Sequence, residues 1–381
     1  MYNWEKRMKF DYDLKNYNFL LLFLIAAMNV CGILIVRSAS NMDSAVVTRQ
    51  VVGSLTGMAM CIVISFIDYR KLIKYANLIY GFCLFALLAV LIWGAVHKGA
   101  GRWIVLPVIG QIQPAEFVKI GIIVFFSAFF EKNREMISRP PIVLRVVILF
   151  AIPALLILIE PNLSTTIIIA VIFAAIYFCA GISFRWIFAV LASAAVFVGL
   201  LLYTFTTDLY EKIPFLKPYQ KNRILGFLYP DKYGDISAQQ SQSIIAIGSG
   251  GLNGKGLYNT DIGSVKAGNF LIEEDTDFIF AIIGEELGFR GALLIFAGFL
   301  LMIFLLLSIA SKARDLSGKL ICVGMAAWIG FQTFTNIAVA TGLFPNTGVP
   351  LPFFSRGVSS LLSIYIGLGI AMNVGLQRRK L

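Results

Sequence analysis

The sequence has 381 residues, of which 59% are hydrophobic and only 14% are charged. So few charged side chains cannot cover a soluble globular surface, so the composition excludes a soluble protein and predicts an integral membrane protein. The formal net charge of +11 could suggest nucleic-acid binding, but the cations lie mostly in short loops beside apolar segments, and we expect no nucleic-acid partner.

Ten apolar segments are suited to crossing the hydrocarbon core of a bilayer, which is about 30 Å thick. They are residues 17–36, 45–67, 72–96, 115–130, 142–159, 163–180, 186–205, 278–310, 320–341 and 358–376. The eighth is long enough to tilt or to extend beyond the membrane. We therefore expect an all-α membrane fold that forms a single polytopic domain over residues 1–381.

Basic residues cluster in alternate loops, which fixes the expected orientation because Lys and Arg favour the cytoplasmic side. These loops carry Arg70, Lys71, Lys74, Lys132, Arg134, Arg139, Arg185, Lys312, Arg314 and Lys319. Both termini are then cytoplasmic, and the long hydrophilic segment 206–277 between the seventh and eighth spans lies outside. A loop of that length predicts a functional role.

The outer loop contains a glycine-rich stretch at residues 247–256 that includes Lys255. Exposed amides and one lysine can approach phosphate oxygens closely. The spacing is not that of a Walker loop, because no Ser or Thr follows the lysine. Taken alone, a plain surface turn is the simpler interpretation.

An acidic cluster stands where the loop enters the eighth span. Its members are Glu273, Glu274, Asp275, Asp277, Glu285 and Glu286. Charges near the membrane core are costly, which favours a functional role. A carboxylate just before a helix also interacts with the helix dipole, so a capping role for Asp277 is an equal alternative on spacing alone.

Two further constellations border the spans. Glu116 and Lys119 are three residues apart, so they share a helix face, and they follow Arg102 closely in the sequence. They either bind substrate or form a structural ion pair, and spacing alone favours the ion pair. Asn336 precedes the proline- and glycine-rich segment 341–357, which cannot be regular helix. This segment either lines a wet cavity or is a rigid connector.

Together these motifs resemble the SEDS family (shape, elongation, division and sporulation), which includes RodA, FtsW and SpoVE. The resembling strings run the length of the chain: RQ at 49–50, GRWI at 101–104, IQPAE at 112–116, QQSQS at 239–243, the glycine stretch, DTDF at 275–278, GEELGF at 284–289 and TGVPLPFFS at 347–355. The short tails and the N-terminal FDYDL favour the RodA-like branch. Roles in elongation, division and sporulation all remain open.

The resemblance implies a peptidoglycan glycosyltransferase of the bacterial cytoplasmic membrane that polymerises lipid II, the undecaprenyl-pyrophosphate-linked disaccharide-peptide, at the outer face. Asp277 would be the catalytic base that accepts the proton of the acceptor sugar's 4-hydroxyl. Residues expected to bind substrate or pyrophosphate are Arg49, Arg102, Lys119, Arg223, Lys255, Gln239, Gln242, Ser243 and Ser355. Supporting roles are expected for Glu116, Glu273, Glu286 and Asn336.

The sequence departs from the family pattern at four places. Residues 160–165 read EPNLST where the family usually reads QPDLGT, so an amide, Asn162, replaces an acid. Asp275 stands for a usual histidine, Ala238 for a usual tyrosine, and Arg356 lies within the usual SYGGSS. None of these changes removes Asp277, so catalysis remains the first interpretation of a divergent member.

No cofactor is implied with certainty; a divalent cation, Mg or Mn, is compatible with the chemistry, and no metal ligands are assigned. The resemblance implies a class B penicillin-binding protein as partner, besides membrane lipids. Two other functions fit the same charges: a flippase that moves lipid II across the membrane, and a non-catalytic scaffold for the penicillin-binding protein.

Overall fold

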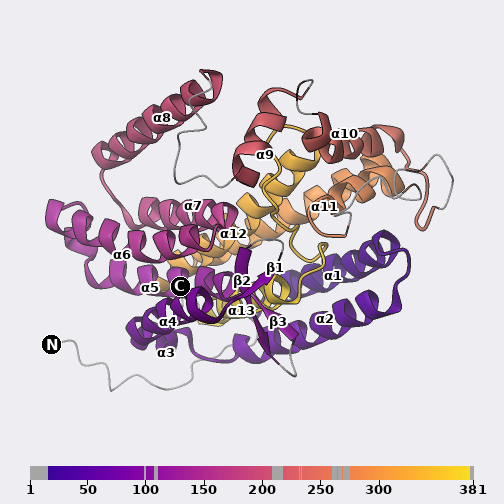
Figure 1. Cartoon of the computed structure of the whole chain (residues 1–381). Coiled ribbons are helices and arrows are strands. Elements are labelled where there is room, and N and C mark those ends of the chain that lie inside the picture. Colours follow the sequence, from indigo (N-terminus) through magenta and orange to yellow (C-terminus); the bar gives the residue numbers. More distant parts are fainter. Residues whose placement is uncertain are drawn as a thin grey trace.

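The computed structural model describes residues 16–97, 100–106, 110–207, 218–230, 232, 234–259, 264, 268 and 275–377. Its helices are α1 (Phe19–Ala39), α2 (Ser44–Ser65), α3 (Tyr69–Lys74), α4 (Ala76–Trp93), α5 (Pro114–Lys132), η3 (Arg134–Met136), α6 (Pro140–Ile159), α7 (Leu163–Ala180), α8 (Phe184–Thr206), α9 (Pro218–Leu228), α10 (Gly234–Ser249), α11 (Ile279–Ser311), α12 (Leu316–Ala340) and α13 (Val358–Leu376). The all-α fold expected from the composition is confirmed (Figure 1).

Within the described residues, eight helices are long and apolar enough to span a membrane. They are α1, α2, α4, α6, α7, α11, α12 and α13. The predicted segments 115–130 and 186–205 also form helices, α5 and α8. Helix α5 carries four charged residues, so its composition alone does not mark it as a span, and its packing in the bundle is the argument for one. The count of ten crossings stays a prediction.

The predicted span 72–96 is wrong at both ends. The chain forms the short helix α3, which includes residues 72–74 of the predicted span, breaks at Tyr75 and then forms α4. Asp68 caps α3 by accepting from the Arg70 amide at 2.9 Å. At the far end Gly94 is extended, and the chain enters strand β1 (Ala95–His97) instead of continuing as helix.

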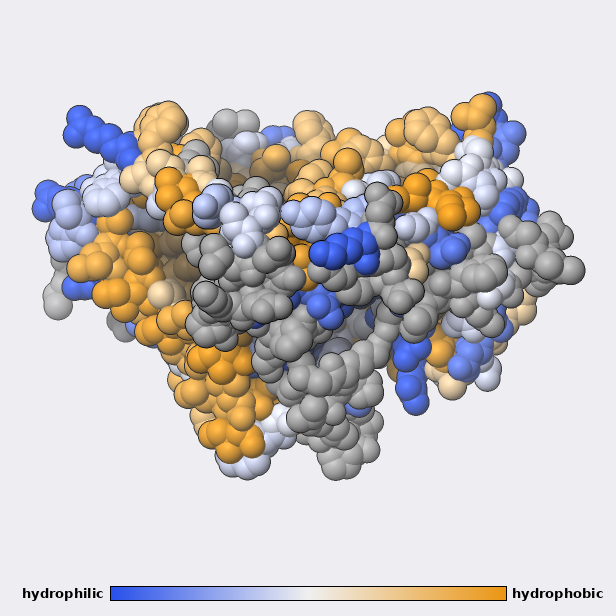
Figure 2. Space-filling model, turned by 45° about the horizontal axis from the view of Figure 1, so that its top comes forward, coloured by the Kyte–Doolittle hydropathy of each residue, from blue (hydrophilic) through white to orange (hydrophobic). Residues whose placement is uncertain are grey.

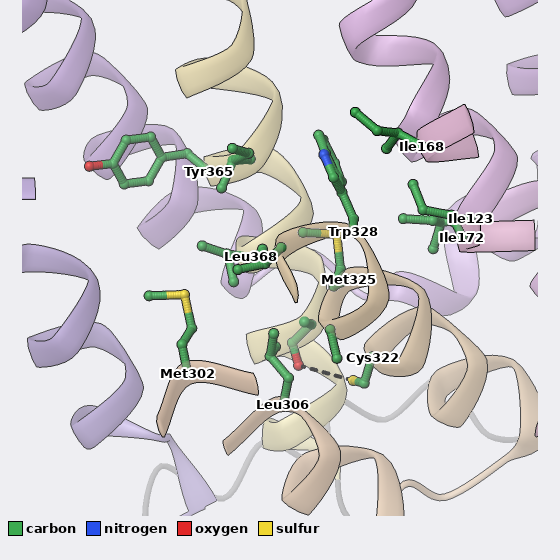
Figure 3. Packing of buried hydrophobic residues seen from close by; sticks show 14 of the residues in the cluster. Ile123, Ile168, Ile172, Met302, Leu306, Cys322, Met325, Trp328, Tyr365 and Leu368 are labelled. Carbon is green, nitrogen blue, oxygen red and sulfur yellow. Dashed lines mark hydrogen bonds between the residues drawn. The ribbon is translucent and has the colours of Figure 1, made fainter. Parts of the chain in front are cut away.

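Helices α12 and α13 form the centre of the bundle, since 72% and 78% of their apolar stretches are buried, against 28–39% for the other six spans. Helix α12 packs against α5, α7, α11 and α13, and α2 packs along α13. Figure 3 shows Trp328 and Met325 of α12 between Ile123 of α5 on one side and Leu368 of α13 on the other. This central packing fixes the ends of α12 and α13, which lead into the site.

The periphery is apolar. Helix α4 exposes large side chains such as Leu78, Phe82 and Trp93, and in Figure 2 hydrophobic residues form broad continuous patches on the face. Water would penalise such a surface, whereas lipid does not. The exposure pattern therefore fits a bundle surrounded by a bilayer.

The outer segments contain more regular structure than the sequence indicated. Strands β1, β2 (Ala100–Leu106) and β3 (Gly110–Ile112) pair antiparallel in the order β1-β2-β3. The predicted loop 206–277 contains α9 and α10, which lie side by side, with α10 also packed on α11 and α12 (Figure 1). Residues 247–249 of the predicted glycine turn are the last turn of α10, so the turn begins only at Gly250.

Helix α11 contains a break. Gly288 has φ 66° and ψ −170°, which lies outside helical geometry and favours glycine. The break separates a first segment, in which residues 279–286 are buried, from a longer apolar stretch. The expected extension of the eighth span is thus a separate helical segment, and it begins at Ile279, two residues after Asp277.

Candidate functional site

The loop that joins α12 to α13 is the structural centre of the candidate site. Its three prolines lack amide hydrogens, so helical hydrogen bonds cannot form there. Two buried amide side chains of α12 bind its carbonyl oxygens instead. Asn336 Nδ2 donates to the Val349 oxygen and Gln332 Nε2 to the Pro350 oxygen, each at 2.8 Å. The loop is therefore fixed to the central helix, as irregular backbone at a membrane surface requires.

The backbone of residues 275–277 is held at each of its three carbonyl oxygens. In chain order these oxygens accept from the Arg356 amide at 2.8 Å, the Ser355 hydroxyl at 2.6 Å and the Asn336 side-chain amide at 2.9 Å. The Asp277 side chain itself is half-buried. A carboxylate on a fixed backbone is preorganised, which a catalytic base requires.

Gly348 lies between Asp277 and Arg223 of α9. A Cβ added at Gly348 would stand 3.3 Å from Asp277 Oδ2 and 3.7 Å from Arg223 Nη1. The carboxylate and the guanidinium therefore face the same glycine and are no further apart than the sum of these distances. Gly348 also has φ +70°, a conformation in which a side chain is strained. Both facts explain why this position needs glycine.

The predicted pair Glu116 and Lys119 forms an ion pair beneath the loop. Lys119 Nζ lies 2.7 Å from Glu116 Oε1, and both side chains are buried. The ammonium also lies 3.5 Å from Gln332 Oε1 and 5.0 Å from the centre of the Trp328 ring. Because Gln332 holds the loop at Pro350, the pair supports the loop from inside the bundle.

A second cation, Arg102 on β2, reaches the turn between α6 and α7. Its guanidinium donates Nε to the carbonyl oxygen of Glu160 at 3.2 Å and Nη2 to that of Pro161. Ser164, at the start of α7, donates to the carbonyl oxygen of Thr347. This turn is therefore connected to the loop one residue before Gly348.

Glu160 is the most perturbed acid in this region. Its side chain is 1% exposed, and neither carboxyl oxygen has a hydrogen-bond partner in the structure. Burial raises the pKa of Glu160 to about 8, against the lowering effect of the Arg102 charge. Glu160 is consequently a neutral acid over much of the physiological pH range.

The glycine-rich turn docks on the first segment of α11. The amides of Lys255 and Gly256 donate to the carbonyl oxygens of Glu285 and Glu286, both at 2.9 Å. Lys255 Nζ lies 2.7 Å from Glu285 Oε1, and Glu286 accepts from Ser38 of α1 at 2.5 Å. The turn thus bridges the α11 break. Pyrophosphate binding by Lys255 stays a prediction, and it would require the lysine to leave its ion pair with Glu285.

The QQSQS segment lies on α10. Ser243 is buried and donates to a carbonyl oxygen at the end of α12 at 2.8 Å. Gln240, which the sequence did not single out, donates to the carbonyl oxygen of Phe344 at 2.7 Å. Gln239 and Gln242 are half-buried on the same helix. Ser243 and Gln240 dock α10 onto the site loop.

The remaining predicted residues lie in different settings. Arg49 is exposed on α2, although the neighbouring Gln50 donates to a carbonyl oxygen of the site loop at 3.5 Å. Ser355 is buried and its hydroxyl also accepts from the loop amide of Leu351 at 2.7 Å, which favours a bracing role over substrate contact. Glu273 lies outside the described residues.

The described residues contain no group of three or more His, Cys, Asp or Glu side chains placed to hold a metal ion. Arg223 lies near the Asp277 carboxylate, and its positive charge disfavours a second cation there. The arrangement is suited instead to proton transfer and to binding an anionic group.

Sequence reasoning missed Gly348, Gln332, Ser164 and Glu160 as site residues. Gly348 and Ser164 fell within quoted strings, but only the fold brings them beside Asp277 and the site loop. For Glu160 a signal was present, because an acid at the membrane end of an apolar span is unusual.

Three comparisons relate the chain to known proteins. Residues 14–380 match the model of the FtsW/RodA/SpoVE family, described as "Cell cycle protein". The chain is 32% identical over 363 residues to "Peptidoglycan glycosyltransferase MrdB" of Escherichia coli K12, covering 95% of this chain and 94% of the relative. It is also 32% identical over 375 residues to "Probable peptidoglycan glycosyltransferase FtsW" of Geobacter sulfurreducens, covering 95% and 96%.

Solved structures agree. A chain from a study of polymerization and crosslinking by a peptidoglycan synthase complex superposes with a TM-score of 0.79 at 28% identity, covering 95% of this chain and 98% of that one. Thermus thermophilus rod shape-determining protein RodA superposes with a TM-score of 0.70 at 26% identity, covering 96% and 98%. The similarity therefore extends over nearly the full length of each protein.

Proposed function

This chain belongs to the FtsW/RodA/SpoVE family of cell cycle proteins, and from that premise we propose that Asp277 is the general base with which it polymerises lipid II. Its relatives are peptidoglycan glycosyltransferases, and the chain is one as well: a multi-pass enzyme of the bacterial cytoplasmic membrane. The substrate, the residue roles and the partner are the proposal.

The observation that carries the proposal is the fixed backbone of residues 275–277 beside a cation. Three hydrogen bonds hold the carbonyl oxygens, and Arg223 faces the same glycine as the Asp277 carboxylate. A base next to a guanidinium can accept a proton at one oxygen while the cation attracts the anionic leaving group of the same reaction.

The chemistry is a direct displacement. The acceptor's 4-hydroxyl oxygen attacks C1 of the donor sugar, its proton passes to an Asp277 oxygen, and the bond from C1 to the lipid pyrophosphate breaks. One base is enough for this inversion, unlike the carboxylate pair of a glycoside hydrolase. Negative charge grows on the pyrophosphate as it leaves, and Arg223 and Arg102 are the cations best placed to stabilise it.

Glu116 and Lys119 act differently in this account. Because the two charges neutralise each other inside the bundle, Lys119 supports the site loop through Gln332 and does not itself bind pyrophosphate. A divalent cation, if lipid II brings one, would bind to the substrate phosphates, and no protein cage is required for it.

A lipid II flippase is the alternative from another class. Its intramembrane charges would be the same, but it would need a path open to each side in turn. The positioned base and cation beside one loop favour the enzyme. The partner that we propose is a class B penicillin-binding protein, which would crosslink the strands; the similarity to a chain of a peptidoglycan synthase complex supports it.

The test is polymerisation of purified lipid II by the purified protein, with and without a class B penicillin-binding protein, alongside lipid II translocation in liposomes. We expect glycan strands on a gel and no translocation. Translocation without polymer under every condition would establish the flippase, and neither activity would support a scaffold.

A further inference from the structure

The buried acid Glu160 has no role in the mechanism above. It ends α6 at the turn before α7, is 1% exposed, and both of its carboxyl oxygens lack a partner. An unpaired polar group in such a place is costly, so its retention calls for an explanation. The Arg102 charge acts on Glu160 and lowers its pKa against the larger effect of burial.

The charged surroundings of Glu160 are simple. Helices α4 and α7 carry no charged side chain, and neither do residues 341–355. Glu116 and Lys119 of α5 are paired with each other. Arg102 of β2 is therefore the charged group that faces Glu160, and its guanidinium contacts the backbone carbonyl of this residue, not its carboxyl group.

The turn and the site loop form one unit. Arg102 is held by the carbonyl oxygens of residues 160 and 161, and Ser164 binds the carbonyl oxygen of Thr347. Gly348, the next residue, faces Asp277 and Arg223. A change in the orientation of Arg102 would therefore occur beside the groups that handle the sugar diphosphate.

We propose that Glu160 is a positioning residue for Arg102: as a neutral acid it leaves the Arg102 charge to bind the pyrophosphate of the donor, and as a carboxylate it competes for that charge. The proposal rests on the proposed function, because it takes the anion to be the donor pyrophosphate. This chain differs here from its family pattern, with an acid at residue 160 and an amide, Asn162, two residues later.

The competition gives a definite pH dependence. The pKa of Glu160 is raised to about 8 by burial, so the carboxylate form becomes dominant above that pH. With one proton linked to binding, the apparent KM for lipid II should rise by up to about tenfold per pH unit beyond this point. The rate at saturating lipid II should also fall over this range, because Arg102 would stabilise the charge that grows on the departing pyrophosphate.

The experiment measures lipid II polymerisation by the purified full-length protein from pH 6 to 9.5, separated into KM and kcat. Glu160→Gln fixes the neutral form, and Glu160→Met removes the acid while filling similar volume. Glu135→Gln, an exposed acid on η3, is the control for lost charge. Ionisations of lipid II and of other groups in the protein are common to all variants, so the difference between variants is the readout.

We expect the KM of the native protein and of Glu135→Gln to rise above about pH 8, and the KM of both Glu160 variants to stay low and flat. A purely structural Glu160 would change stability and leave the profile of the variants parallel to the native one. Parallel profiles in folded variants overturn the proposal.

Binding of undecaprenyl pyrophosphate, measured over the same pH range, separates this inference from the proposed function because it needs no turnover. If polymer forms but the binding of native protein and Glu160→Gln responds to pH alike, this inference fails and the function stands. If no polymer forms but only native binding weakens at high pH, the function fails and the role of Glu160 stands.

Discussion

Gly348 provides a sharp test of the site geometry, because its replacement by alanine adds one methyl group at a known place. The new Cβ would stand 3.3 Å from Asp277 Oδ2, closer than an ordinary van der Waals contact, so the carboxylate must move by a few tenths of an ångström. The φ of +70° adds a strain of about 1–2 kcal/mol to the folded state.

Displacing a base by a fraction of an ångström costs about ten- to a hundredfold in rate, or roughly 1.4–2.7 kcal/mol in the barrier. We therefore expect Gly348→Ala to remain folded, with a modestly lower melting temperature, and to lose about that factor in kcat. The assay is lipid II polymerisation at saturating substrate, with thermal unfolding measured on the same samples.

Gly342→Ala is the matched control. It has φ +78° in the same connection, but its added Cβ would meet only the flexible end of Ile244, at 2.8 Å. It should lose similar stability and little activity. Native kcat in folded Gly348→Ala, or an equal loss in Gly342→Ala, would refute the placement of Asp277.

Three other variants test separate parts of the account. Lys119→Met leaves the buried Glu116 unpaired and should destabilise the protein by about 3–5 kcal/mol. Adding Glu116→Gln should restore part of the lost melting temperature. If the double variant melts no higher than Lys119→Met, the buried ion pair is contradicted. The pKa of Glu160 rises from an ordinary 4.5 to about 8, so between these pH values the folded state binds one proton that the unfolded state has lost, and stability falls as pH rises. Glu160→Gln should therefore flatten the decline in melting temperature between pH 5 and 9. An unchanged slope would exclude a buried acid at this position. In the ion pair between Asp275 and Arg356, 2.7 Å long, the arginine is half exposed and the acid is 16% exposed. Because water screens the arginine, a double-mutant cycle of thermal unfolding should give a coupling of only about 0.2–1 kcal/mol that vanishes in high salt. A larger coupling that does not depend on salt would contradict this screening.

The length of the apolar segments was sufficient to predict the long apolar helices, because the thickness of the bilayer sets that length. Segment 163–180 coincides with α7, and the other predicted spans match helices to within a few residues. The error at residues 72–96 arose because Gly94 and the pairing of β1 with β2 end the helix, and neither feature changes hydropathy.

The site was predictable in part. Asp277 was predicted as a site residue because the DTDF string resembles the family motif, and Asn336 because it precedes the proline- and glycine-rich segment 341–357. Their relation to Gly348 was not, because it depends on a loop some seventy residues further along the chain than the acid. Helices α9 and α10 were missed because they are too polar to be recognised as spans and depend on packing, α9 on α10 and α10 on α11 and α12.

The role of Asp277 is tested most directly by comparing Asp277→Asn with Asp275→Asn in lipid II polymerisation. The two acids are two residues apart, and each variant removes one charge without changing size. The account predicts a loss of about 10²–10⁴-fold in rate for folded Asp277→Asn and near-native rate for Asp275→Asn. Equal polymer from native protein and folded Asp277→Asn would contradict it.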